Sequence, residues 1–210
     1  MALALLCQRT FVNVRLERGL SRPIFPKPPV QTAVSQRSGG PYAIHSSIYE
    51  FLRDAEVPFT VVPHRPGTTD REEAAAAHVP AREWARVTLC VVDGQLVEAV
   101  VPTTLSVDLD RLLELARGKD IRFASEDERL RLFPDFESGA VPPLGPLYGQ
   151  QVFVEVSLAA EHEIVFNAGS HTEAISMRWA DFAASVRPIV GKFGTPAGDH
   201  VGAFRLSFRE

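Results

Sequence analysis

Residues 164–177, IVFNAGSHTEAISM, decide the fold of this chain. The apolar run IVF stops at the polar segment NAGSH, and a second run, AISM, follows it. This pattern predicts two strands joined by a tight turn, because Gly169 can adopt backbone angles that residues with a side chain avoid. His171 then lies at the turn. It is either a functional group held on the edge of a rigid sheet or a histidine that only caps the turn.

The composition is that of an ordinary globular protein. The 210 residues are enough for one well-buried domain. The net charge of -4 gives no sign of general nucleic-acid binding, so we expect no DNA partner. No apolar run approaches the roughly 20 residues that cross a bilayer, so we expect no membrane partner. The two cysteines, Cys7 and Cys90, lie in different segments without metal-ligating neighbours. A reducing, cytoplasmic environment fits this pattern best.

The first 41 residues differ from the rest. They carry six basic residues against one acidic residue, and four prolines between residues 23 and 29 break any helix. Three interpretations stay open: a disordered leader, an Arg-rich organelle-targeting peptide, or upstream sequence included by a misplaced start. We expect a poorly ordered basic extension at 1–41, one domain at 42–192 and a C-terminal tail at 193–210.

Helices and strands are interspersed along the predicted domain. The β-branched run 87–92, the dipeptide Asp93-Gly94 and the returning run 96–101 are typical of a hairpin with a two-residue turn. Capping-box patterns, a serine or threonine followed three residues later by glutamate, predict helix starts at Ser47, Thr69 and Ser125. Hairpins outnumber plausible parallel crossovers, which favours an α+β fold with a mixed, largely antiparallel sheet and flanking helices.

The common catalytic and cofactor motifs are absent. The sequence has no phosphate-binding Gly-Lys-Ser/Thr loop, no GxGxxG after a strand and no HExxH, so we expect no cofactor and no metal. The trio 161–163, Glu-His-Glu, is a poor metal site because adjacent strand residues point to opposite faces. Cys90 lies in an apolar run, which favours a buried structural thiol over a nucleophile.

A possible site without a protein nucleophile remains. The segment 138–149, SGAVPPLGPLYG, is rich in glycine and proline and predicts a rigid, irregular loop with open backbone amides. Such amides can stabilise an oxyanion on an ester carbonyl. A histidine such as His171 can orient water, and a cation such as Arg86 can hold a phosphate or a carbonyl oxygen.

In chain order, five pieces carry a resemblance to a known family: VVPHRPGTTDREEAAAA (61–77), ARVTLCVVDG (85–94), VDLDRLLELA (107–116), FASEDERLRLFPDFESGAVPPLGPLYG (123–149) and IVFNAGSHTEAISM. Together they are similar to the YbaK/ProX family of trans-editing aminoacyl-tRNA deacylases, which resemble the editing domain of bacterial prolyl-tRNA synthetases. The similarity runs from about residue 47 to residue 186. GAVPPLG followed by FNAGSHTEAI is its most specific part.

The resemblance implies a six- or seven-stranded mixed sheet and hydrolysis of the ester that joins a wrong amino acid to the tRNA 3′ end. In this family no side chain attacks the ester; backbone amides of the loop hold the carbonyl, and the terminal ribose hydroxyl helps to activate water. The implied catalytic residues are Arg86, Gly139 and His171. The implied substrate-binding residues are His64, Ala140, Val141, Pro142, Gly145, Asn167, Gly169 and Ser170.

The resemblance also implies partners and one departure. The partner is the 3′ acceptor end of a mischarged tRNA, and a synthetase or an elongation factor could present it. Arg86 stands where the family usually has lysine, and arginine is larger and does not lose its proton near neutral pH. The alternative is therefore a catalytically weak binding module of the same fold, which recognises aminoacyl-adenosine-like ligands or docks a synthetase.

Overall fold

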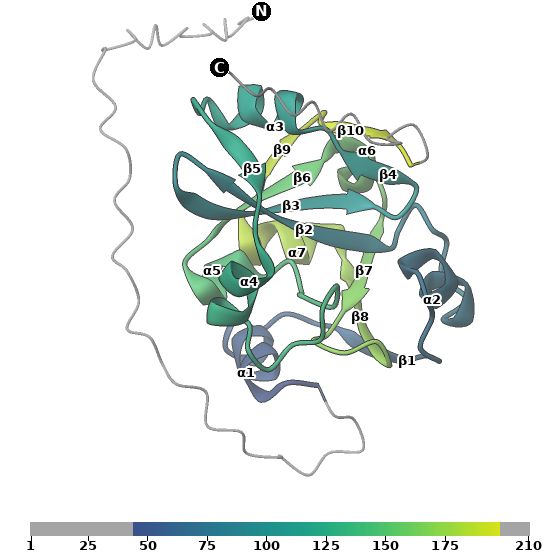
Figure 1. Cartoon of the computed structure of the whole chain (residues 1–210). Helices are drawn as coiled ribbons and strands as arrows, with labels where there is room; N and C mark the ends of the chain where they lie inside the picture. The colour runs from purple at the N-terminus through teal and green to yellow at the C-terminus, as the bar shows by residue number, and fades with distance from the viewer. Residues whose placement is uncertain (1–43, 198–210) are drawn as a thin grey trace, which may run out of the picture.

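The structure, a computed structural model, describes residues 44–197 (Figure 1). The predicted extension at 1–41 and most of the predicted tail lie outside these residues. The helices are α1 (Ser46–Asp54), α2 (Asp70–Ala76), α3 (Leu109–Ala116), α4 (Glu126–Leu132), α5 (Gly145–Tyr148), α6 (Val156–Ala159) and α7 (Trp179–Val186). The strands are β1 (Thr60–Pro63), β2 (Ala85–Val92), β3 (Gln95–Pro102), β4 (Leu105–Val107), β5 (Ile121–Phe123), β6 (Gln151–Glu155), β7 (Glu163–Asn167), β8 (Glu173–Arg178), β9 (Ile189–Gly191) and β10 (Gly194–Pro196).

The strands form a mixed arrangement, as predicted. The largest sheet has the order β5-β2-β3-β6-β9, in which β6 runs parallel to both β3 and β9. A three-stranded antiparallel sheet has the order β1-β8-β7, and β10 pairs with β4. The ten strands of the described residues exceed the six or seven expected, partly because β9 and β10 are short pieces that the sequence pattern did not reveal.

Both predicted hairpins are present. β2 and β3 pair over eight positions, and Asp93 and Gly94 between them have φ angles of 49° and 80°. These positive values are what a twist-matched two-residue turn requires. β7 and β8 pair antiparallel from Glu163↔Arg178 to Asn167↔Ala174, so residues 168–172 form the turn.

The open edge of β2 positions the candidate site. β3 occupies one edge of β2 along its whole length. On the other edge β5 pairs with residues 90–92, while the segment before β2 meets β7 through the Trp84↔Val165 bridge. Among the described strands, none pairs with the part of this edge around Val87. The carbonyl of Leu89 points to this edge, where it accepts a hydrogen bond from the amide of Ala124. Since the backbone groups of alternate strand residues point to the same edge, those of Val87 also point there.

The two faces of the large sheet carry separate cores. On one face, α3 packs through Leu112 against Cys90, Ala99 and Phe153. On the other face, a larger cluster joins residues of α1 and α7 with β6, β7 and the segment 133–144. In Figure 1, α3 and α1 accordingly lie at opposite ends of the molecule.

Several local details differ from the sequence-based expectation. Helix α1 begins at Ser46 without the predicted Ser47 capping box, because its N-cap residue, His45, makes no side-chain cap hydrogen bond. The box at Ser125 is complete. Gly145 starts a short helix, so only the first half of the 138–149 segment is irregular. Since β10 pairs with β4, the fold also extends past the boundary predicted at residue 192.

Candidate functional site

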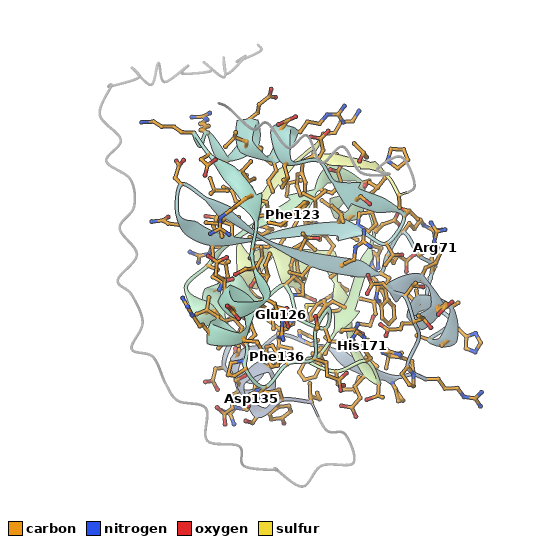
Figure 2. The ribbon with its side chains drawn as sticks, in the orientation of Figure 1. Arg71, Phe123, Glu126, Asp135, Phe136 and His171 are labelled. Carbon is orange, nitrogen blue, oxygen red and sulfur yellow. The ribbon has the colours of Figure 1, made fainter. Side chains whose placement is uncertain are left out.

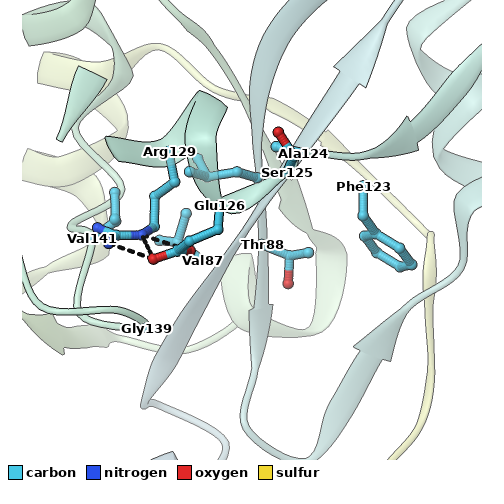
Figure 3. Close-up of a pocket in the computed structure, with 10 residues that line it drawn as sticks. Val87, Thr88, Phe123, Ala124, Ser125, Glu126, Arg129, Gly139 and Val141 are labelled. Carbon is cyan, nitrogen blue, oxygen red and sulfur yellow. Dashed lines mark hydrogen bonds and ion pairs between the residues drawn. The ribbon is translucent and has the colours of Figure 1, made fainter. Parts of the chain in front are cut away.

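A cavity of about 230 Å³ opens at the free edge of β2 (Figure 3). It lies between the start of α4 and the irregular loop. Its lining residues are Val87, Thr88, Leu89, Phe123, Ala124, Ser125, Glu126, Arg129, Gly139 and Val141. A larger hollow of about 470 Å³ lies at Arg111, Glu114, Leu115 and Lys192, but it includes none of the predicted site residues.

Hydrogen bonds hold the irregular loop onto the β7–β8 turn. The amide of Gly169 donates to the carbonyl of Ala140, and the amide of Glu137 donates to the carbonyl of Gly169, both at 3.0 Å. Gly169 has a φ of 95°, and a Cβ added to it would lie 2.9 Å from Cδ1 of Phe136. The glycine therefore serves both the turn and the close approach of the loop.

Among the described residues, two loop amides beside the cavity have no hydrogen-bond partner. The amide of Ala140 donates to the carbonyl of Glu137, and that of Leu144 donates to Pro142. The amide of Gly145 is directed at the buried carboxyl of Glu98 without reaching hydrogen-bond geometry. Within the described residues, the amides of Gly139 and Val141 have no hydrogen-bond partner, and both residues line the cavity. An oxyanion site needs such preorganised donors.

His171, labelled in Figure 2, binds the start of this loop through one ring nitrogen. Its Nε2 lies 2.8 Å from the carbonyl oxygen of Ser138, and its Nδ1 lies 2.7 Å from Oε1 of Glu73. Both partners are acceptors, so the ring is bound as an imidazolium that donates from both nitrogens. Burial lowers the pKa of His171, but the hydrogen bond to Ser138 and the charges of Glu73 and Glu137 outweigh it and raise the pKa.

Glu73 is a site residue that the sequence reading missed. It lies on α2, is 1% exposed, and accepts a second hydrogen bond from Nδ2 of Asn167 at 2.8 Å. A buried carboxylate is stable only when it is paired and hydrogen-bonded, and His171 and Asn167 supply both partners. The sequence offered a weak signal, since the alanines that follow Glu73 indicate that this side of the short helix is packed. Nothing in the sequence reveals which residue it pairs with.

Arg86 lies outside the cavity lining but near His171: burial raises the pKa of Asp70, and the charges of Arg86 and His171 both oppose that rise. Its Nη2 donates to the carbonyl of Leu105 at 2.7 Å, and its Nε lies 3.6 Å from Oδ2 of Asp70. Side chains alternate along a strand, so Arg86 lies on the same face of β2 as Thr88, whereas Val87 and Leu89 lie on the other face. Arg86 is not among the residues that line the cavity.

The other predicted binding residues have supporting positions outside the cavity lining. His64 follows β1, donates its amide to the carbonyl of Thr172, and packs edge-on against Trp84 at 5.2 Å between ring centroids. The hydroxyl of Ser170 lies 3.2 Å from that of Thr172. Ala140, Pro142 and Gly145 are buried in the loop. Of the predicted residues, only Gly139 and Val141 line the cavity itself.

Arg129 is the cation at the cavity. Its guanidinium pairs with Glu126 through Nε and Nη2, and its Nη1 donates to the carbonyls of Phe133 and Phe136. The hydrogen bond from Arg129 holds the pKa of Glu126 below its usual value. Arg129 therefore joins the start of α4 to the segment that leads into the loop. The sequence predicted the helix that carries Arg129 and Glu126 but gave neither residue a function.

The site holds no evident nucleophile or metal cluster among the described residues. Ser125 is engaged in its capping box with Glu128. Burial raises the pKa of the Cys90 thiol to about 12, so this cysteine is a structural residue, as predicted. No group of three histidine, cysteine, aspartate or glutamate side chains in residues 44–197 could hold a metal ion. No described helix is long and apolar enough to cross a membrane.

These features define a member of a known class. Residues 64–184 match the family model of the aminoacyl-tRNA editing domain, so the chain belongs to that family. A search of curated protein sequences finds no match.

Solved structures share the fold at low sequence identity. A hypothetical protein, APE2540, superposes with a TM-score of 0.64 at 17% identity, covering 71% of this chain and 99% of its own. A proposed trans-editing enzyme for prolyl-tRNA synthetase gives a TM-score of 0.60 at 18% identity, covering 71% and 96%. A proposed signal transduction protein from Marinobacter aquaeolei VT8 gives 0.57 at 17% identity, covering 71% of this chain and 30% of its own.

Proposed function

We propose that this protein hydrolyses the ester between a wrong amino acid and the 3′ end of its tRNA. The observation that carries the proposal is the pair of open amides at Gly139 and Val141, both on the wall of the cavity. The family supports the substrate class. The structural neighbour described as a trans-editing enzyme for prolyl-tRNA synthetase agrees with this choice at the level of the fold.

In this mechanism the loop amides hold the acyl carbonyl. When water adds to the carbonyl carbon, negative charge develops on the carbonyl oxygen, and fixed amide donors stabilise it without reorganisation. The loop is fixed through Gly169 on one side and through the His171 hydrogen bond to Ser138 on the other. His171 therefore acts as a positioning residue, since both of its nitrogens are already occupied.

The attacking group is water. Glu126 is held by Arg129 with a lowered pKa, which makes it a weak base, and Ser125 is engaged in a cap. No lining side chain is thus arranged as a general base. The terminal ribose hydroxyl next to the ester is the remaining group that can orient the water, and the departing ribose oxygen takes the proton that the attacking water gives up as the bond breaks.

A binding module of the same fold is the second candidate. The lack of a prepared base in the cavity favours it, because binding of an aminoacyl-adenosine-like ligand needs the same amides and no proton transfer. Docking of a synthetase or an elongation factor also stays a prediction. Neither changes the chemistry proposed for the loop.

The test is deacylation of a matrix of correctly charged and mischarged tRNAs by the full chain. The proposal expects release of the amino acid from at least one mischarged tRNA, and a fall of about 10²-fold in kcat for His171→Ala, the effect typical of losing one oxyanion support. His162→Ala is the matched control, since this exposed histidine lies in the turn before β7.

The outcomes separate the two candidates. Release of amino acid that depends on His171 supports the deacylase. Tight binding of a non-hydrolysable 3′-aminoacylamino-adenosine without any release from the matrix supports the binding module. If the wild-type protein neither binds the analogue nor releases an amino acid, both candidates are wrong.

A further inference from the structure

Phe123 presents an exposed aromatic ring at the rim of the cavity. Its side chain is 53% exposed, although it lies at the end of β5 among residues that pair with β2. Single exposed apolar residues are common on protein surfaces. Phe123 differs from Tyr49, another exposed aromatic residue, in that it also lines the cavity.

Hydrogen bonds fix the end of β5, which carries Phe123, to the start of α4. Arg122 donates from Nη1 to the carbonyl of Phe123 at 3.1 Å and binds both carboxylate oxygens of Glu128. The same glutamate accepts the amide of Ser125 in the capping box at the start of α4. The hydrogen bond from Arg122 lowers the pKa of Glu128 to about 2, so these contacts persist over the working pH range.

The cavity has two sides, separated by the open edge of β2. Opposite residues of an antiparallel pair share a face, and Phe123 is opposite Cys90. Phe123 therefore lies on the same side of β2 as Thr88, whereas Val87 and Leu89 point to the side of Val141. Figure 3 shows Phe123 and Thr88 on one side of the strand and Val87 and Val141 on the other.

We propose that Phe123 is the stacking platform for the terminal adenine of the tRNA, so that the ester crosses the open edge of β2 to reach the loop amides. This inference rests on the proposed function for its choice of ligand. Aromatic side chains on rigid segments bind unpaired bases by stacking. Because Gly139 and Val141 hold the acyl side, the opposite side of the strand edge is the part of the cavity left for the nucleoside.

The experiment compares Phe123→Ala, Phe123→Leu and Phe123→Trp. Phe123→Ala should raise KM for aminoacyl-tRNA about 10- to 100-fold, the loss that stacking of one base predicts, with little change in kcat. Phe123→Leu keeps an apolar surface but cannot stack, so its KM should rise nearly as much. Phe123→Trp should retain the wild-type KM. Tyr49→Ala is the control for loss of an exposed aromatic residue outside the cavity.

Two further measurements make every outcome decisive. Hydrolysis of the same amino acid esterified to 1-O-methylribose, which keeps the neighbouring hydroxyl but has no base, should proceed equally in wild type and Phe123→Ala. Calorimetric binding of a 3′-aminoacylamino-adenosine should weaken in Phe123→Ala by the same factor as KM rises.

An active enzyme with unchanged KM in Phe123→Ala would overturn the inference and leave the deacylase proposal intact. Binding of the analogue that depends on Phe123, without hydrolysis, would support the inference and refute the deacylase. Failure of the wild type to bind the analogue would overturn the inference whatever the rate of hydrolysis.

Discussion

Oε1 of Glu73 lies 2.7 Å from Nδ1 of His171, although 98 positions separate the two residues in the sequence. This contact joins α2 to the β7–β8 turn. The opposite ring nitrogen of His171 binds the carbonyl of Ser138, and a Cβ on Gly139 would lie 3.5 Å from Cε1 of the ring. The loop amides at the cavity therefore depend on a charge on a distant helix.

The first prediction concerns Glu73→Gln. A neutral partner removes a charge that raises the pKa of His171, so this pKa should fall. A raised folded-state pKa contributes stability that is complete below the unfolded value of about 6.5 and is lost as pH rises through the folded value. In Glu73→Gln this loss should be complete at lower pH. NMR titration of the His171 ring would measure the pKa, and urea denaturation between pH 6 and pH 9 would measure the loss of stability.

The matched control for Glu73→Gln is Glu72→Gln. Glu72 is the neighbouring glutamate on α2, but it is exposed and accepts the amide of Thr68, a bond that glutamine can also accept. Loss of a hydrogen bond to a charged group costs about 1.5–3 kcal/mol, so Glu73→Gln should also lower the free energy of unfolding at pH 7. An unchanged pKa of His171 in Glu73→Gln would contradict the proposed effect of Glu73 on the His171 ring.

The second prediction compares two glycines that both have positive φ. Gly94 and Gly169 have φ values of 80° and 95°, so alanine at either position should cost about 1 kcal/mol in backbone strain. A Cβ on Gly94 meets nothing within 4 Å, whereas one on Gly169 lies 2.9 Å from Phe136. Phe136 is buried and stacks with Phe133, so it cannot move freely.

Gly169→Ala should therefore cost about 1–3 kcal/mol more than Gly94→Ala, the range for an overpacked core. It should also reduce deacylation, because the loop is hydrogen-bonded to this residue. Urea denaturation of both variants measures the difference in the free energy of unfolding. Equal losses in the two variants would mean that the loop does not pack against the turn as described.

The third prediction concerns Arg86→Lys. Arg86 is not among the residues that line the cavity, and its guanidinium binds the Leu105 carbonyl and pairs with Asp70. We expect no gain in kcat from lysine here. We expect a loss of about 1 kcal/mol in stability, because lysine cannot reach both partners in the same geometry. Arg71→Lys, at an exposed arginine of α2, is the control. A large gain in kcat would show that residue 86 does face the reacting ester.

The sequence predicts the parts of this site that local pattern determines. The turn residues Asp93-Gly94 and Gly169 define two hairpins, and the Ser125 box defines the start of α4. The contacts of Arg86 with Leu105 and Asp70 could not be predicted, because they join β2 to segments that are distant in the sequence. Glu73 and Phe123 could not be found because pairing across the chain and exposure at a cavity arise only in the folded molecule.

The last prediction concerns Glu98, a charged residue type in the core. Glu98 is fully buried on β3, and neither carboxyl oxygen has a hydrogen-bond partner in the described residues. Burial raises the pKa of this carboxyl well above its usual value. Between the unfolded and the folded pKa the folded state holds one more proton than the unfolded state, so stability should fall by about 1.4 kcal/mol per pH unit as pH rises above about 4.5.

The glutamine of Glu98→Gln does not titrate, so this pH-dependent fall in stability should be absent from the variant. The free energy of unfolding of wild type should therefore fall further behind that of Glu98→Gln at each higher pH. Below about pH 3.5 the pH-dependent difference between the two proteins should vanish, because the wild-type carboxyl is then largely neutral in both states. Glu155→Gln is the contrasting variant. Glu155 is also buried, but it accepts the amides of Phe193 and Gly194, so the substitution should destabilise the fold. Urea denaturation at pH 5, 6, 7 and 8 gives the curves, and parallel lines for wild type and Glu98→Gln would show that Glu98 is ionised in the folded protein.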